Sequence, residues 1–214
     1  MTIQHHPDIS TLIAYAAGAL GEALSVVVAS HLDVCGECRR EAMRMNRLGG
    51  AIMDASPSEP LASSDAGVVL RGGKVPAQDR PAVPAKHGLP RPLARLLGKP
   101  LELIAWKAVA PGVKLYSLPL SPGASGHLAL LKVAPGRGIP DHGHGGSELT
   151  MVLQGAFRDE HGIYRIGDVE DIDGEHEHQP VVEGEETCIC IIASEAKALF
   201  KGWAGRLVQP LTGL

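Results

Sequence analysis

The stretch GRGIPDHGHGGSELTMVLQG, residues 136–155, decides how the second half of this 214-residue chain is interpreted. His142 and His144 stand two positions apart, so on an extended strand both side chains point to the same face. Glu148 follows a Gly-Gly-Ser turn and begins the next apolar run. Two imidazoles and a carboxylate that converge from neighbouring strands are suitable ligands for a first-row metal. The stretch therefore predicts a metal site inside a β structure.

The sequence around this stretch has the pattern of an all-β domain. From about residue 100 onwards, short apolar runs with a period of two are separated by Gly, Pro and Asp. Examples are WKAVAPGVKLYSLPL, HLALLKVAPG and TCICIIAS. Many short strands with frequent turns are typical of a sandwich or a barrel. We therefore expect an all-β domain over residues 100–214.

A second group of potential metal ligands lies in HLDVCGECRR, residues 31–40. His31, Cys35 and Cys38 occupy positions i, i+4 and i+7, which places them on one side of a helical segment. Two Cys at this spacing are also found in redox dithiols, where they open a helix directly after a strand. Here the preceding segment has a helical pattern, which favours a metal site.

A closed tetrahedral zinc site needs a fourth ligand in addition to these three. His5 and His6 lie roughly one helix upstream, and antiparallel first and second helices would bring them close to His31. We expect His6 to be the ligand because it immediately precedes the helix start at Pro7–Asp8; His5 is the alternative. The zinc would be structural, since metal binding supplies folding free energy to a module with a small core.

Residues 8–54 contain no Pro and carry helical spacing of apolar residues, which predicts a small helical bundle. The first helix starts after Asp8 as its cap and ends near Gly21. The second covers about residues 22–32, and the third extends from Cys35 or Gly36 to about residue 53. The positions expected to face the core are Ile9, Leu12, Ile13, Ala16, Leu20, Leu24, Val27, Val28, His31, Met43, Leu48 and Ile52.

Residues 55–100 are rich in Pro, Ser, Ala and Gly, which is the composition of a linker. The short run AGVVLR, residues 66–71, fits either one further helix turn or an exposed part of the linker. The expected organisation is thus α+β with two domains. A zinc-stabilised helical domain covers residues 1–85, and the β domain covers residues 100–214.

Composition excludes several classes of function. The formal net charge of −4 leaves no basic surplus to neutralise phosphates, so direct nucleic-acid binding is not expected. No apolar run reaches the length of about 18 residues that a membrane-spanning helix needs. The N-terminus has neither the basic nor the apolar segment of a secretory signal. We therefore expect a cytoplasmic protein, in which Cys residues serve as metal ligands or redox groups.

The pattern G-x5-H-x-H-x3-E-x6-G, from Gly136 to Gly155, resembles the first motif of the cupin family of β barrels. The resemblance implies that His142, His144 and Glu148 are metal ligands and that a second motif supplies one more His. 

The candidate for that second motif is GDVEDIDGEHEHQP, which lacks the usual Pro and second Gly and offers His176 and His178. Both side chains would point to the same face of an extended strand, so spacing alone does not indicate which His is the ligand. Because it precedes Gln179–Pro180, His178 resembles the ligand of ChrR-type cupins, and we expect it to complete the set.

The upstream His and the H-x3-C-x2-C pattern resemble the zinc-binding anti-sigma factor domain over roughly residues 1–55. Members of that family wrap a helical bundle around an extracytoplasmic-function sigma factor and block it from core RNA polymerase. The fusion of such a bundle to a cupin, with TCICIIAS and GRLVQP near the end, resembles the ChrR-type anti-sigma factors over essentially the whole chain. This resemblance implies one Zn²⁺ in each domain, a 1:1 complex with the sigma factor, and release in response to singlet oxygen. The zinc ligands that it implies for the helical domain are His6, His31, Cys35 and Cys38.

An enzyme is the alternative function. A set of three His and one Glu also occurs in cupin dioxygenases, where a metal with an open position carries out oxygen chemistry. Nothing else in the β domain identifies an acid–base pair or a substrate anchor. The pairing of modules therefore favours a regulator without enzymatic activity over a metal-dependent enzyme that carries an N-terminal zinc-binding interaction module.

Two features of residues 165–197 have more than one interpretation. Asp and Glu are concentrated there, and we expect them to form a solvated rim rather than a docking face for a basic partner. Cys188 and Cys190 lie on the same face of one strand, where a disulfide would be strained. We expect them to be small buried apolar residues, with redox sensing as the alternative.

Overall fold

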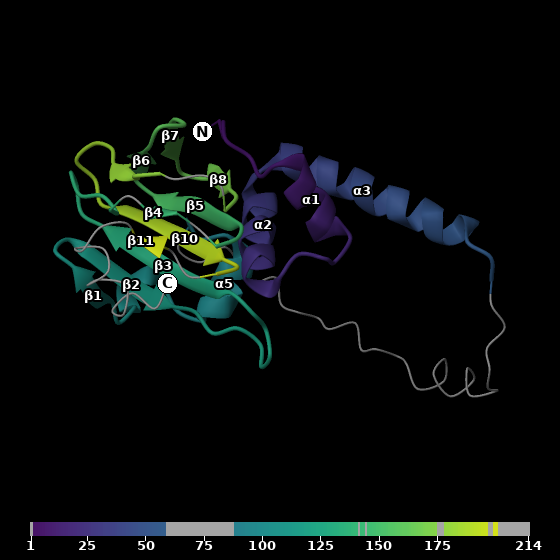
Figure 1. Ribbon diagram of the computed structural model, residues 1–214, viewed down its shortest axis with the longest axis horizontal. Coiled ribbons are helices and arrows are strands. Elements are labelled where there is room, and N and C mark those ends of the chain that lie inside the picture. The colour runs from purple at the N-terminus through teal and green to yellow at the C-terminus, as the bar shows by residue number, and fades with distance from the viewer. Residues whose placement is uncertain are drawn as a thin grey trace.

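The computed structural model describes residues 2–58, 88–140, 142–143, 145–174, 178–196 and 199–200, with the backbone only for His142, Leu199 and Phe200. Helices form the N-terminal part and antiparallel strands form the rest (Figure 1). The α+β class predicted from the sequence is therefore confirmed. The run AGVVLR and the expected domain boundary at residue 85 lie outside the described residues.

Three helices follow one another near the N-terminus: α1 (Ile9–Ala16), α2 (Glu22–Val34) and α3 (Gly36–Ala55). The apolar face expected of α2 is confirmed, since Leu24, Val27 and Val28 are all buried. Asp8 occupies the N-cap position of α1 but makes no side-chain capping hydrogen bond. Within the described part of the chain, none of the helices has the length and apolar content to span a membrane.

The core positions expected on α3 are wrong. Met43, Leu48 and Ile52 are 46%, 60% and 61% exposed. The second half of α3, which carries Leu48 and Ile52, extends beyond α1 and α2, and no other described element covers it (Figure 1). On α1 only Leu12 is buried, and Ile9 and Ile13 are also exposed.

A short helix, α5 (Arg91–Leu97), lies within the segment expected to be a linker. It buries Leu93 and Leu97 against α2 and ends at Gly98, whose φ of 63° is left-handed. The backbone N–H of Arg91 donates to Asp33 Oδ2 at 2.9 Å, and its guanidinium pairs with the same carboxylate. Hydrogen bonds from Arg91 lower the pKa of Asp33. The chain therefore returns to the helices before it enters the β domain, by way of the 3-10 turn η2 (Leu101–Leu103).

The β domain consists of one large sheet and smaller ones. The six-stranded sheet has the order β1-β2-β3-β10-β5-β8, the three-stranded sheet has the order β7-β6-β9, and β11 pairs with β4. All pairs are antiparallel. The bounds are β1 (Lys107–Ala110), β2 (Val113–Ser117), β3 (His127–Val133), β4 (His142–Gly143), β5 (Glu148–Gln154), β6 (Ala156–Arg158), β7 (Ile163–Arg165), β8 (Val169–Ile172), β9 (Val181–Val182), β10 (Cys188–Ser194) and β11 (Leu199–Phe200).

The large sheet is apolar on both faces. Because side chains alternate along a strand, Leu130 and Ile191 face the helices, whereas Leu131 and Cys190 face the interior of the barrel. The outer face of β3, β5 and β10 packs against α2 in one continuous core. A strand buried on both faces carries a nearly continuous apolar run, and every residue of β10 is buried. The helices thus form a layer that packs against the sheet. The linker composition of residues 55–100 did not predict this contact.

Loss of a side chain from this shared core should destabilise the protein. Ile191→Ala removes a side chain with 0% exposure and is expected to lower the free energy of unfolding by roughly 2–5 kcal/mol. Ile52→Ala, at a position that is 61% exposed, should change it by less than about 0.5 kcal/mol. Chemical denaturation checks both. Equal effects of the two substitutions would contradict the shared core.

Candidate functional site

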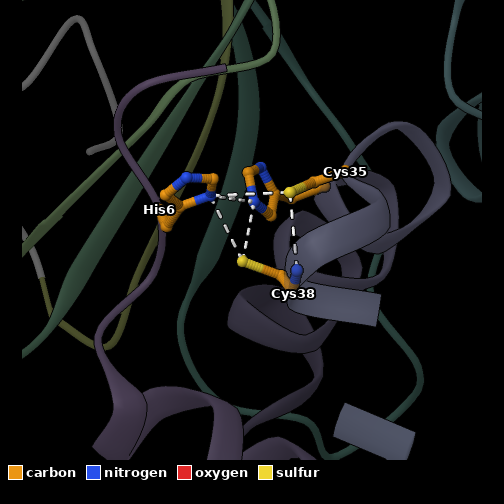
Figure 2. A group of neighbouring side chains, drawn as sticks. His6, Cys35 and Cys38 are labelled. Carbon is orange, nitrogen blue, oxygen red and sulfur yellow. Dashed lines mark hydrogen bonds between the residues drawn. The ribbon is translucent and has the colours of Figure 1, made fainter. Parts of the chain in front are cut away.

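Four potential metal ligands lie together where the helices meet the barrel. We call this group, His6, His31, Cys35 and Cys38, the clasp. Figure 2 shows the ring of His6 and the two sulfur atoms pointing toward a common centre. One ligand atom from each residue lies within 4.8 Å of all the others. The structure therefore brings together the four residues expected from the sequence, in a site able to hold a metal ion.

The distances in the clasp fit a tetrahedral ion. His6 Nδ1 is 3.5 Å from His31 Nε2, 3.5 Å from Cys35 Sγ and 3.3 Å from Cys38 Sγ. His31 Nε2 is 3.3 Å from Cys38 Sγ. A tetrahedron with Zn–N of about 2.0 Å and Zn–S of about 2.3 Å has edges of about 3.3–3.8 Å. The donor set and its spacing thus match zinc.

A break between two helices creates this geometry. Cys35 ends α2 in an extended conformation and is the N-cap of α3, where its sulfur accepts a hydrogen bond from the Cys38 N–H at 3.5 Å. His31 lies one turn earlier on α2, and His6 lies on the extended segment before α1. The other candidate, His5, points elsewhere: its ring lies 4.4 Å from the ring of Tyr164 in the barrel.

The environment of the clasp holds His31 in one tautomer. A carbonyl oxygen can only accept, so the 2.9 Å contact with Gly167 O means that His31 Nδ1–H is the donor. Nε2 is then unprotonated and faces the cluster, as a metal-binding imidazole requires. Burial lowers the pKa of His31 to about 4. Burial also raises the pKa of the Cys38 thiol to about 12 in the absence of a metal, whose binding would favour the thiolate.

The second candidate site is a cavity of about 400 Å³ inside the barrel. Its walls are apolar except for a few polar groups, among them Glu148, Thr150, Glu170 and His178. Glu148 and His178 from the expected ligand set therefore line the same cavity. The side chain of His142 is not described, and His144 and His176 lie outside the described residues.

His178 is held by two acidic residues that the sequence analysis did not single out. Its Nδ1 is hydrogen-bonded to Glu170 Oε1 at 2.9 Å and lies 3.7 Å from Asp159 Oδ2. All three side chains are at most 2% exposed. Burial, together with the neighbouring Asp159, raises the pKa of Glu170 well above its usual value.

The expectation that the acidic residues of positions 165–197 form a solvated rim is wrong for two of them. Asp168 and Glu170 are each 2% exposed, whereas Asp173, Glu185 and Glu186 are exposed. Glu170 alternates with Val169 along β8 and therefore faces the barrel interior. That alternation was the available signal, but the many neighbouring charges obscured it.

Cys188 and Cys190 lie side by side on the inner face of β10. Both are buried, and their sulfur atoms are 3.5 Å apart, in hydrogen-bonding contact rather than in a disulfide. The contact with Cys188 and burial raise the pKa of the Cys190 thiol well above its usual value. Both side chains line the barrel cavity.

Known proteins resemble this chain along its length. Residues 99–198 match the ChrR cupin-like domain family. The anti-sigma-E factor ChrR of Cereibacter sphaeroides is 42% identical over 213 residues, which cover 98% of each chain. The structure superimposes on a chain in the crystal structure of Rhodobacter sphaeroides SigE in complex with the anti-sigma ChrR, with a TM-score of 0.75 and 41% identity. This match covers 90% of our chain and 99% of that chain. The protein therefore belongs to the ChrR family of anti-sigma factors.

Proposed function

We propose that this protein binds an extracytoplasmic-function sigma factor in a 1:1 complex and keeps it from core RNA polymerase. A relative of known structure, the anti-sigma ChrR, is seen in complex with SigE. The observation on this chain that supports the proposal is the exposed apolar surface of α3. A soluble protein leaves such side chains uncovered mainly where a partner binds.

We call Leu48, Ile52 and Met53 the docking surface. They are 60%, 61% and 74% exposed and lie on the half of α3 that extends away from the barrel (Figure 1). A helix that presents an apolar face can lie in a groove of a helical partner. The docking surface is therefore the part of the helical domain, residues 1–85, that we assign to the sigma factor.

The clasp supports this surface indirectly. We propose that it binds Zn²⁺ through His6, His31, Cys35 and Cys38. These ligands come from the N-terminal segment, from α2 and from the start of α3, so one ion would fix three segments relative to one another. A structural zinc of this kind contributes directly to folding free energy.

We propose that the barrel, residues 100–214, is the domain that responds to singlet oxygen. Glu148 and His178 line its cavity, and we propose that they hold a second Zn²⁺ together with His142 and His144. In this proposal singlet oxygen acts at the barrel and the sigma factor is then released. The protein is a regulator rather than an enzyme, and it acts in the cytoplasm, on the sigma factor and without direct contact to nucleic acid.

The two neighbouring His residues of the N-terminal segment provide a matched test of the clasp. His6→Ala should lower the zinc content of the purified protein by one ion per chain, because it removes one of four ligands. His5→Ala should retain the wild-type content, because His5 contacts Tyr164 instead. Metal analysis by mass spectrometry measures both. Wild-type zinc content in His6→Ala would contradict the clasp.

Charges placed on the docking surface should prevent capture of the sigma factor. The double variant Leu48→Asp/Ile52→Asp is expected to bind at least tenfold more weakly, since two carboxylates would lose their hydration in an apolar interface (about 1.4 kcal/mol per tenfold). Leu103→Asp on η2, at a position that is 68% exposed, is the control and should bind normally. Titration calorimetry with the purified sigma factor gives the affinities. Unchanged affinity of the double variant, at unchanged zinc content, would move the binding site elsewhere.

In the proposed function the helical domain binds the sigma factor, and the barrel responds to singlet oxygen. Glu148→Ala should leave affinity for the sigma factor within about twofold of wild type, because Glu148 lies inside the barrel. The same variant should no longer release the factor when a photosensitiser generates singlet oxygen. A reporter gene driven by the sigma factor measures repression and induction, with the exposed Glu186→Ala as control. Loss of repression in Glu148→Ala would contradict this division.

A further inference from the structure

One short segment, Gly167–Asp171, contacts both candidate metal sites. It contains the start of β8, which is the edge strand of the large sheet. Along a strand, successive side chains point to opposite faces. Here Gly167 and Asp168, which directly precede the strand, contact the clasp and the N-terminal segment, whereas the side chain of Glu170 on β8 points into the barrel.

The contacts on the clasp side hold two of its ligands in place. Gly167 O accepts the hydrogen bond from His31 Nδ1 at 2.9 Å. Asp168 Oδ1 accepts from the N–H groups of Gln4 at 2.7 Å and His5 at 3.2 Å, directly before His6. The position of His6 thus depends on a buried carboxylate of the barrel.

The edge of β8 extends this docking along the N-terminal segment. The N–H of Val169 donates to His5 O at 3.1 Å, and the N–H of Asp8 donates to Asp171 Oδ2 at 2.9 Å. His6 lies between these two attachments. The segment that carries His6 is therefore bound to the sheet on both sides of the ligand.

The contact on the barrel side comes from Glu170. Its Oε1 is hydrogen-bonded to His178 Nδ1 at 2.9 Å inside the cavity. Glu170 stands between Val169 and Asp171, both of which bind the N-terminal segment. The backbone that orients His178 is thus the backbone that orients the clasp.

The backbone of Gly167–Asp171 cannot easily shift at its barrel contacts without also shifting at its clasp contacts. Gly167 has a φ of +92°, and a Cβ at this position would lie 2.9 Å from Ile3 Cδ1. On its other edge β8 is paired with β5 from Val169 to Ile172. A displacement of Glu170 would therefore be transmitted to Asp168 and Gly167, since close-packed segments shift together.

We propose that Asp168 and Glu170 are positioning residues on one short segment, and that this segment, Gly167–Asp171, couples the barrel cavity to metal binding in the clasp. The proposal rests on the clasp being a metal site, as proposed above, and does not require capture of a sigma factor. Because linkage is reciprocal, a change of the cavity at Glu170 must alter the affinity of the clasp for its metal, and metal in the clasp must alter the cavity.

Cobalt can test this coupling at the clasp. Co²⁺ bound to thiolates gives a near-ultraviolet charge-transfer band, and the Cys35→Ser/Cys38→Ser protein defines the signal that does not come from the clasp. Titration of the metal-free full-length chain yields the Co²⁺ affinity. Asp168→Ala, which removes a direct support, should weaken it. Glu170→Ala, which touches no clasp ligand, should also weaken it by about fivefold or more.

Two further variants separate coupling from general damage to the fold. Glu170→Gln should restore near-wild-type affinity, because the side-chain amide can still form a hydrogen bond with His178 Nδ1. Leu118→Ala removes a buried side chain from the shared core, 6% exposed, and should lower the melting temperature without weakening Co²⁺ binding. If Glu170→Ala does not fold, Asp159→Ala removes the other carboxylate beside His178 Nδ1 and should weaken Co²⁺ binding in its place.

Three results would overturn the inference: wild-type affinity in Glu170→Ala, weak binding in Glu170→Gln, or equal weakening in Leu118→Ala. Absence of the thiolate band in the wild-type chain would refute the clasp itself. Binding of the sigma factor is measured separately, so failure of the proposed function cannot be mistaken for failure of the coupling.

Discussion

The structure depends on the packing of α2 against the outer face of β3, β5 and β10. Val27 and Val28 of α2 and Leu130 and Ile191 of the sheet are all 0% exposed. Burial of apolar surface at about 25 cal/mol per Å² is the main favourable term in folding, so this contact decides where the helices lie. It also determines where His31 lies, because His31 follows Val27 by one turn on the same face of α2. The clasp is therefore located at the junction of helices and barrel by the apolar core beneath it.

The local spacing of residues was sufficient to predict the clasp and the β domain. The i, i+4, i+7 pattern of His31, Cys35 and Cys38 indicated one shared side of a helical segment. The structure brings the three residues together at a break between two helices, where Cys35 is extended. His6 required one tertiary assumption, the antiparallel approach of the first two helices. What spacing could not predict was the role of Asp168 and Glu170, since their burial comes from the pairing of β8 and the docking of residues 3–8. Charge-rich composition is usually exposed, and here the exception marks two positioning groups.

The wrong prediction for α3 has a different physical reason. Helical periodicity shows that a face is apolar but does not show what covers it. Leu48 and Ile52 follow the pattern of a core helix, yet the described chain provides no layer over them. Under the proposed function the missing layer is the sigma factor, so the error identifies the docking surface. The helix α5 is the opposite case: Pro-rich surroundings concealed two buried Leu residues that pack against α2.

The position of the docking surface limits how a signal in the barrel could release a partner. The second half of α3 extends away from the sheet, so a bound partner would not be displaced by direct contact with the cavity (Figure 1). A change in the barrel must instead reach α3 through the elements between them. The clasp is such an element, because Cys35 caps α3 and Cys38 lies in its first turn. His31 is hydrogen-bonded to Gly167, and the backbone directly before His6 is hydrogen-bonded to Asp168. Metal binding, docking of the helices and orientation of α3 then form one linked equilibrium. A disturbance at Glu170 would act on the sigma factor by altering that equilibrium, without any contact between the sensing cavity and the partner.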